Sequence, residues 1–361
     1  MTSAVSSPAA HRHAMRVWLL AVAALIFLTV LVGGATRLTE SGLSIVEWQP
    51  VTGVLPPLSE EGWQIEFQKY QTIPQYQERN FGIGLEAFKV IYWWEWTHRL
   101  LGRLIGAAFL LPFLYFLWRG WVEPQFRARL WIIFGLGALQ GVVGWWMVTS
   151  GLAVRVSVAH ERLAFHLTLA CVIYAAVLWT AQSLRDRASA VVVHPHLRTE
   201  AFWIVVILFV QVFFGALVAG LRGGLIYNTW PFIDGGLFPN ADRLMFLSPP
   251  WVNFFDNVLT VQFEHRIIAY VLWLIAMMHL IHAVARRESA AVDGALALAI
   301  AITIQAAFGI ITLLHQAPIV LSLIHQGMAM VVLTIAVVHA NRLAARSAEV
   351  GGAPIPTAWR P

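Results

Sequence analysis

Hydrophobic and polar positions along this chain are grouped in long blocks and do not alternate at a short period. Eight apolar runs are each long enough to cross a bilayer as a helix, which takes about 20 residues. These runs cover residues 17–35, 91–117, 130–149, 158–182, 201–220, 258–284, 294–314 and 320–340. The pattern predicts an all-α membrane protein with eight transmembrane helices, and an even number of spans places both termini on one side.

The composition supports this prediction and excludes soluble folds. Of the 361 residues, 59% are hydrophobic and 12% are charged, whereas a soluble domain carries about 25% charged residues. A water-soluble fold could not hide so much apolar surface. Arg12 and Arg16 precede the first apolar run and no small-residue cleavage site stands out, so we interpret this run as a retained first helix.

The basic residues predict the orientation. Thirteen Lys and Arg residues lie in segments on the side of the termini, and seven lie in much longer segments on the other side. The positive-inside rule then places both termini in the cytoplasm, with a bacterial inner membrane as the expected location. The net charge of +5 therefore reflects topology, and no nucleic-acid partner is expected.

The two halves of the chain repeat each other. The pattern Gly42-Leu43, Trp48 and Gly53 recurs 182 residues later as Gly224-Leu225, Trp230 and Gly235. The series Gln140, Gly144 and His160 recurs 165 residues later as Gln305, Gly309 and His325. The repeats predict two tandem, pseudo-symmetric four-helix bundles, one over residues 1–190 and one over residues 191–361.

Four of the 13 histidines belong to this repeat. His98, His160, His265 and His325 each lie near the outer end of an even-numbered span, where an ionisable side chain is a functional candidate. Pairing them within each half joins His98 to His160 and His265 to His325, and two such imidazoles can hold an iron porphyrin between helices. Zinc would want further Cys or carboxylate ligands, of which the helices offer few.

Two features near these histidines receive no role. His166 follows His160 by six residues, which is about 240° around a helix, so we expect His166 to face elsewhere. His315 ends the seventh span on the outer side. Whether the long outer segment 36–90 covers a site is left open.

Cys171 is the single cysteine, so an intramolecular disulfide and a thiolate metal cluster are excluded.

Arginines at the outer ends of the spans are candidates for binding porphyrin carboxylates. Arg99 and Arg266 directly follow His98 and His265, and Arg37 and Arg222 lie just past the first and fifth spans. Guanidinium groups pair well with carboxylates. The alternative is that these side chains only extend toward the membrane interface.

One carboxylate distinguishes the two halves. Glu95 lies three residues before His98 and therefore on the same helix face, whereas the corresponding residue of the second half is Gln262, which cannot titrate. We expect Glu95 to serve in proton transfer beside the first porphyrin. The alternative is a structural ion pair with Arg99 or Arg103.

Taken together, these motifs resemble the haem A synthase family, specifically its cysteine-free bacterial branch. The resemblance rests on Gly33-Gly34-Ala35-Thr36-Arg37-Leu38, Glu95-Trp96-Thr97-His98-Arg99, Glu264-His265-Arg266 and His325-Gln326, and it covers nearly all eight spans. It implies an oxidoreductase that oxidises the C8 methyl group of haem O through a hydrated aldehyde to the formyl group of haem A, for use in terminal oxidases.

The resemblance also implies a division of labour between the halves. A haem b cofactor would lie on His265 and His325 with Arg266 and Arg222 nearby. The haem O substrate would lie near His98 and His160 with Arg99 and Arg37, and Glu95 would be catalytic. Haem O synthase and an electron acceptor that the sequence does not identify would be partners, and the aromatic lipid-facing surface would allow homo-oligomers.

Three other functions agree less well with the sequence. A membrane di-haem b electron-transfer cytochrome without biosynthetic activity would use the same four histidines, but both sites lie near one face, which disfavours a transmembrane electron wire. A prenyl transferase would need Asp-rich magnesium motifs, and the five aspartates are dispersed. A solute transporter would not explain the duplicated histidines.

Overall fold

The computed structural model of the chain describes residues 7–185 and 194–348, and every named element in them is a helix. Eight helices are long and apolar enough to cross a membrane. These are α1 (Pro8–Leu38), α4 (Leu85–Trp118), α5 (Pro124–Leu152), α6 (His160–Ser183), α7 (Pro195–Gly220), α11 (Val258–Ala285), α12 (Ser289–Leu314) and α13 (Ile319–Ala348). The predicted all-α, eight-span, multi-pass membrane protein is confirmed.

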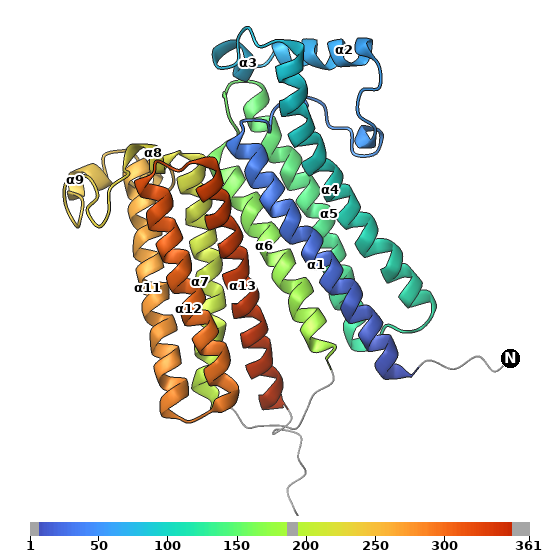
Figure 1. Ribbon diagram of the computed structural model, residues 1–361, viewed down its shortest axis with the longest axis vertical. Helices are drawn as coiled ribbons and strands as arrows, with labels where there is room; N and C mark the ends of the chain where they lie inside the picture. Colours follow the sequence, from blue (N-terminus) through green and yellow to red (C-terminus); the bar gives the residue numbers. More distant parts are fainter. Residues whose placement is uncertain (1–6, 186–193, 349–361) are drawn as a thin grey trace, which may run out of the picture.

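Seven short elements lie in the two long segments that connect α1 to α4 and α7 to α11. They are η1 (Thr52–Val54), α2 (Glu60–Gln71), α3 (Pro74–Glu78), α8 (Gly223–Ile226), α9 (Ala241–Leu244), η2 (Pro250–Val252) and α10 (Asn253–Asp256). Figure 1 shows both segments at the same end of the long helices, opposite the N-terminus. We call this end of the molecule the loop end.

Several helices begin well before the apolar runs that predicted them. Helices α1, α5 and α7 each have proline in the first turn, at Pro8, Pro124 and Pro195, whereas the apolar runs begin at residues 17, 130 and 201. Proline is favoured there because the first helical N–H groups have no partner within the helix. The apolar runs therefore predicted the membrane spans correctly but not the ends of the helices.

The long helices form two groups of four that pack side by side (Figure 1). In the N-terminal group, α1 packs on α4 and α6, and α5 packs on α6; in the C-terminal group, α7 packs on α11 and α13, and α12 packs on α11 and α13. The groups meet where α6 contacts α7 and α13, and where α1 contacts α13. The predicted boundary between residues 190 and 191 lies outside the described residues.

Two hydrophobic cores stabilise the N-terminal group, and the smaller one lies at the loop end. The larger core follows α1, α4, α5 and α6 and includes Met330 and Leu333 of α13, so it continues across the contact between the groups. A smaller core joins segment 43–92 to the outer parts of α4 and α5 through buried aromatic residues such as Tyr70 and Phe88. The long connecting segment is therefore packed onto the N-terminal group.

Candidate functional site

His98 and His265 occupy matching places in the two helix groups. His98 on α4 packs against Gly33 of α1, where an added Cβ would lie 2.7 Å from the imidazole Cε1; for His265 on α11 and Gly215 of α7 the distance is 3.0 Å. Gln211 Nε2 also lies 3.1 Å from His265 Nδ1. Each imidazole thus fills the space that a glycine leaves on the first helix of its group.

His166 and His325 form a second matching pair. His166 on α6 packs against Gly144 of α5, and His325 on α13 packs against Gly309 of α12; an added Cβ would lie 3.0 and 2.8 Å from the two Cε1 atoms. Gln140 donates from Nε2 to the main-chain oxygen of His166 at 3.0 Å. His166, and not His160, therefore makes the contacts that correspond to those of His325.

His160 lies elsewhere, which corrects the expected pairing with His98. It is the first residue of α6, its Nε2 lies 2.9 Å from Asp256 Oδ1, and its Cβ lies against Gly220 of α7. His160 is thus part of the contact between the two helix groups.

The error came from using one offset across a connection whose length differs. Gly144 and His166 are 22 residues apart and Gly309 and His325 are 16 apart, a difference of six, which equals the step from His160 to His166. His166 and His325 correspond when each is counted from the first residue of its helix. His166 follows the first residue of α6 by six residues, as His325 follows Ile319 of α13.

The structure brings the four imidazoles together as two pairs. His98 interacts electrostatically with His166, and His265 with His325. All four side chains are half-buried, and the Nδ1 atoms of His98 and His325 lack a hydrogen-bond partner.

This donor set fits a porphyrin iron, which needs only two axial ligands from the protein. Within residues 7–185 and 194–348, no group of three or more His, Cys, Asp or Glu side chains could hold a metal ion. The buried Cys171 is a free cysteine. Each helix group therefore provides two histidines as potential metal ligands.

Glu95 is a buried carboxylate with four hydrogen bonds. It is 3% exposed and accepts from Ser44 Oγ and Ile45 N, both at 2.8 Å, and from Arg99 Nη2 and Nε at 2.6 and 3.1 Å. Arg99 also donates to the main-chain oxygens of Ile45 and Glu47 at 2.8 and 2.9 Å. The pair thus fastens the start of the long connecting segment to α4, and Arg99, not Arg103, is the ion-pair partner.

The C-terminal group has a neutral version of this arrangement. Gln262 Nε2 donates to the main-chain oxygen of Tyr227 at 2.9 Å, and Arg266 donates to the same oxygen and to that of Phe232, both at 3.3 Å. Gln262 and Arg266 follow Glu95 and Arg99 by 167 residues, and Tyr227 follows Ile45 by 182. The contacts repeat, but the carboxylate is present only in the N-terminal group.

Arg37 and Arg222 lie where the two groups meet at the loop end. Arg37 of α1 donates to the main-chain oxygen of Ala219 of α7. Arg222 forms an ion pair with Glu40, which also pairs with Arg79 at 3.0 Å. Both arginines expected to bind porphyrin carboxylates thus have protein partners in this structure.

A second histidine cluster lies at the other end of the C-terminal group. Glu200 Oε2 lies 2.8 Å from Nδ1 of the fully buried His279, and Glu200 Oε1 lies 2.6 Å from His282 Nδ1. His279 Nε2 in turn lies 2.9 Å from His339 Nε2. The structure thus shows a partly buried polar network at this end of the C-terminal group.

Comparison with known proteins identifies similar chains over almost the whole length. Residues 16–337 match the family model described as cytochrome oxidase assembly protein. A protein of Rhodopseudomonas palustris (strain BisA53) named Heme A synthase is 58% identical over 338 residues, covering 94% of this chain and 93% of its own. A Bradyrhizobium diazoefficiens protein with the same name is 57% identical over 346 residues, covering 96% of each chain.

Proposed function

Because the chain belongs to the cytochrome oxidase assembly protein family, we propose that it is a haem A synthase, an enzyme of haem A biosynthesis whose substrate is haem O. The relatives named Heme A synthase extend over almost the whole chain. The single observation that carries the proposal is the pairing of two matching histidine sites with one buried carboxylate, Glu95, beside only one of them.

The C-terminal group would hold a haem b cofactor. His265 and His325 would hold its iron, and Gly215 and Gly309 leave the room that their imidazoles occupy. Bound there, haem b would supply one-electron transfer. The protein's own contribution is to keep both imidazoles in place on helices that pack tightly around them.

The N-terminal group would bind haem O between His98 and His166. The sequence pattern favoured His160 as the partner of His98. Because His160 lies beside Asp256 and Gly220 instead, we assign this role to His166. In the proposed reaction two successive two-electron oxidations of the C8 methyl group, each followed by addition of a water molecule and release of protons, would give a hydrated aldehyde, which would lose one water to give the formyl group. The electrons pass to an acceptor outside this chain.

Glu95 would act on this reaction through its negative charge. Two hydrogen bonds from Arg99 and two from the 44–45 segment hold the Glu95 carboxylate in a fixed position. An ionised Glu95 would stabilise positive charge that develops at the oxidised carbon, which is an electrostatic form of catalysis. This role suits the observed contacts better than proton transfer, because each carboxylate oxygen already accepts two hydrogen bonds.

Four arginines at the loop end are proposed to bind the porphyrin carboxylates. Arg99 and Arg37 would serve the substrate, and Arg266 and Arg222 would serve haem b. Arg266 supports this proposal most directly, because its Nε is buried and has no hydrogen-bond acceptor among the described residues. The other three would add a carboxylate to the partners they already have.

The proposed topology follows from the charge pattern and from the repeated contacts. Two tandem four-helix units would lie in a bacterial inner membrane, with both termini in the cytoplasm and the loop end in the periplasm. The hydrogen bonds of Arg99 to Ile45 and of Arg266 to Tyr227 support pseudo-symmetry between the units. Haem O synthase, a second copy of the chain and membrane lipid are proposed partners.

The alternative is a di-haem b electron-transfer cytochrome. The two histidine pairs make equivalent contacts, which is what two permanent haem sites would also show. The difference between Glu95 and Gln262 favours the enzyme, because two equivalent electron carriers would not need a buried carboxylate at one site only.

The test is the haem content of matched histidine variants. The protein is purified in mild detergent from cells that make haem O, and its extracted haems are separated by reversed-phase chromatography. We expect His166→Ala to lose haem O and haem A and to keep haem b, His325→Ala to lose haem b, and His160→Ala to keep all of them. Two haem b per chain, unchanged by haem O supply, would refute the enzyme and support the cytochrome.

A further inference from the structure

A cavity of about 270 Å³ lies at the loop end of the N-terminal group, between the 45–57 segment, α2 and the outer part of α4. Its walls include Leu55, Pro57, Ile65, Tyr92, Trp96 and Arg103. The α4 residues among them recur every three or four positions, so they share one helix face, and His98 lies about 130° around the helix from it. The cavity therefore lies against a different face of α4 from His98, and Arg99, the partner of Glu95, is also one of its lining residues.

Two hydrogen-bond donors in the cavity wall have no acceptor. Arg103 donates from Nη2 to the Gln49 oxygen at 2.7 Å and from Nε to the Pro50 oxygen at 2.9 Å, which fixes its guanidinium group. Its Nη1 and the Nε1 of Trp96 are buried and lack a partner among the described residues. A buried donor without an acceptor is costly, so both atoms favour a ligand that carries acceptors.

The charge of Arg103 is also uncompensated. Among the described residues, no carboxylate lies within ion-pair distance of it, whereas Arg99 pairs with Glu95 at 2.6 Å. The two carboxylates in the cavity wall, Glu47 and Glu66, are both held by Lys69, at 3.1 and 2.7 Å. The ligand that would complete the site therefore carries negative charge.

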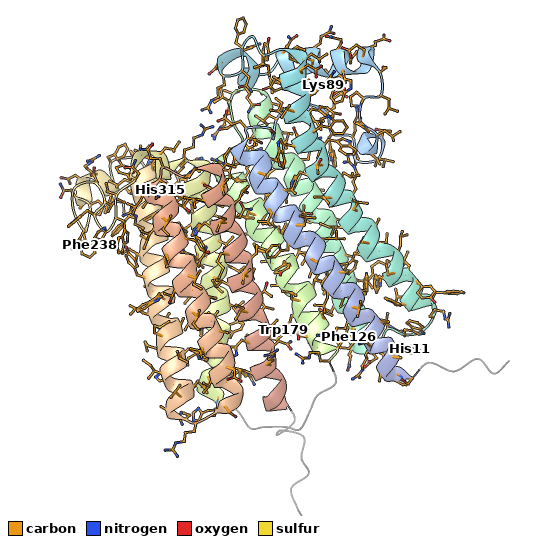
Figure 2. The ribbon with its side chains drawn as sticks, in the orientation of Figure 1. His11, Lys89, Phe126, Trp179, Phe238 and His315 are labelled. Carbon is orange, nitrogen blue, oxygen red and sulfur yellow. The ribbon has the colours of Figure 1, made fainter. Side chains whose placement is uncertain are left out.

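The C-terminal group has different side chains at the corresponding positions. Residues 167 positions after Trp96 and Arg103 are Phe263 and Tyr270, which carry no charge. Trp230 donates from Nε1 to the Tyr270 hydroxyl at 3.0 Å, and Phe238, labelled in Figure 2, packs edge-on against Phe263. The arginine and the tryptophan N–H of the N-terminal group thus have no equivalent at these two positions of the C-terminal group.

The surroundings of the cavity are apolar and lie at the membrane boundary. Val51, Leu55 and Leu58 are 79%, 70% and 82% exposed on the connecting segment beside the cavity. Along α4, Arg103 and Tyr92 are about 22 and 39 Å from the far helix end at Trp118, which brackets the hydrocarbon thickness of about 30 Å. An amphiphile could place its charged group in the cavity and its chains along the exposed apolar side chains.

We propose that this cavity binds an anionic oxygen group carried on an apolar body, namely the phosphate of a phospholipid or a carboxylate of a porphyrin. Arg103 and Trp96 supply the donors. The bound group also stabilises the segment that Arg103 holds at Gln49 and Pro50 and that Arg99 holds at Ile45. The site thereby links the lipid composition of the outer leaflet to the surroundings of Glu95.

The first experiment uses protein purified without haem O supply, so its outcome does not depend on the proposed enzyme activity. Thermal unfolding in mild detergent is followed while phosphatidylglycerol or phosphatidylcholine with the same acyl chains is added, and native mass spectrometry counts bound lipid. We expect phosphatidylglycerol to bind the wild type and raise its unfolding temperature more than phosphatidylcholine does. Arg103→Gln should weaken this binding about tenfold or more.

Matched variants separate the site from general charge effects. Arg243→Gln removes an outer arginine that is paired with Asp234, so it should respond to phosphatidylglycerol like the wild type. Trp96→Phe keeps the ring without the N–H and should weaken binding, and it decides the question if Arg103→Gln does not fold.

A porphyrin source is tested by comparing haem with its dimethyl ester. Loss of the preference for the free carboxylates in Arg103→Gln would identify the porphyrin as the source. The proposal is overturned if neither the lipid nor the porphyrin distinguishes Arg103→Gln and Trp96→Phe from the wild type.

Discussion

Replacing Glu95 by Gln removes the charge from a buried pair while nearly preserving its shape. The carboxylate is 3% exposed and the Arg99 side chain is 16% exposed, so little solvent screens the charge that remains. Breaking a buried pair from one side costs about 3–5 kcal/mol. The main-chain oxygens of Ile45 and Glu47 still accept from Arg99, which favours the lower end, about 3 kcal/mol.

A loss of that size is measurable as a shift in the unfolding temperature. The entropy of unfolding is about 2.1 cal/mol/K per residue, so in a chain of 361 residues each kcal/mol shifts the midpoint by about 1.3 °C, and Glu95→Gln should lower it by about 4 °C. The assay is thermal unfolding of the purified protein in detergent, with haem A formation measured in parallel. Retained haem with no haem A formed would support the proposed electrostatic role of Glu95.

Two controls test whether the loss of stability comes from the buried Glu95–Arg99 ion pair. Glu47 pairs with Lys69, but its side chain is 49% exposed, so Glu47→Gln should cost no more than about 1 kcal/mol. In a double-mutant cycle, adding Arg99→Gln to Glu95→Gln should cost less than the sum of the single changes. Equal midpoints for Glu95→Gln and Glu47→Gln would refute the claim that this carboxylate fastens the segment, and normal haem A formation would refute its catalytic role.

Three further predictions address packing, the second histidine cluster and pH. Gly309→Ala places a Cβ 2.8 Å from His325, so haem b retention should fall in absorption spectra, whereas Gly102→Ala, with nothing within 4 Å, should retain it. Glu200→Ala removes the acceptor beside two histidines and should destabilise the protein by about 1–3 kcal/mol, whereas an unchanged unfolding midpoint would contradict this. A hydrogen bond from Lys69 lowers the pKa of Glu47 below its ordinary 4.5. The ion pair therefore contributes a small stabilisation above pH 4.5, and this stabilisation is lost as the pH falls through the lower pKa of the folded state. Glu47→Gln should remove that part of the pH dependence of unfolding, and an unchanged acid profile would count against the ion pair.

The sequence by itself determined the features that depend on local composition. Eight apolar runs predicted the eight spanning helices because a bilayer requires about 20 apolar residues per helix. Histidines that recur near the outer ends of the second, sixth and eighth spans drew attention to His98, His265 and His325, each of which packs against a glycine of a neighbouring helix. The contrast between Glu95 and Gln262 was also visible, because it needs only an alignment of the two halves.

The tertiary structure decided what depends on contacts between distant residues. His166 replaces His160 because the chain from Gly144 to His166 is six residues longer than the chain from Gly309 to His325, with three of these residues at the end of α5 and three in the connection to α6. This changes where α6 begins and therefore which histidine packs against α5. The partners of Glu95 come from Ser44 and Ile45, about fifty residues earlier in the chain. No local pattern encodes such a contact, because it exists only once the connecting segment has packed onto α4.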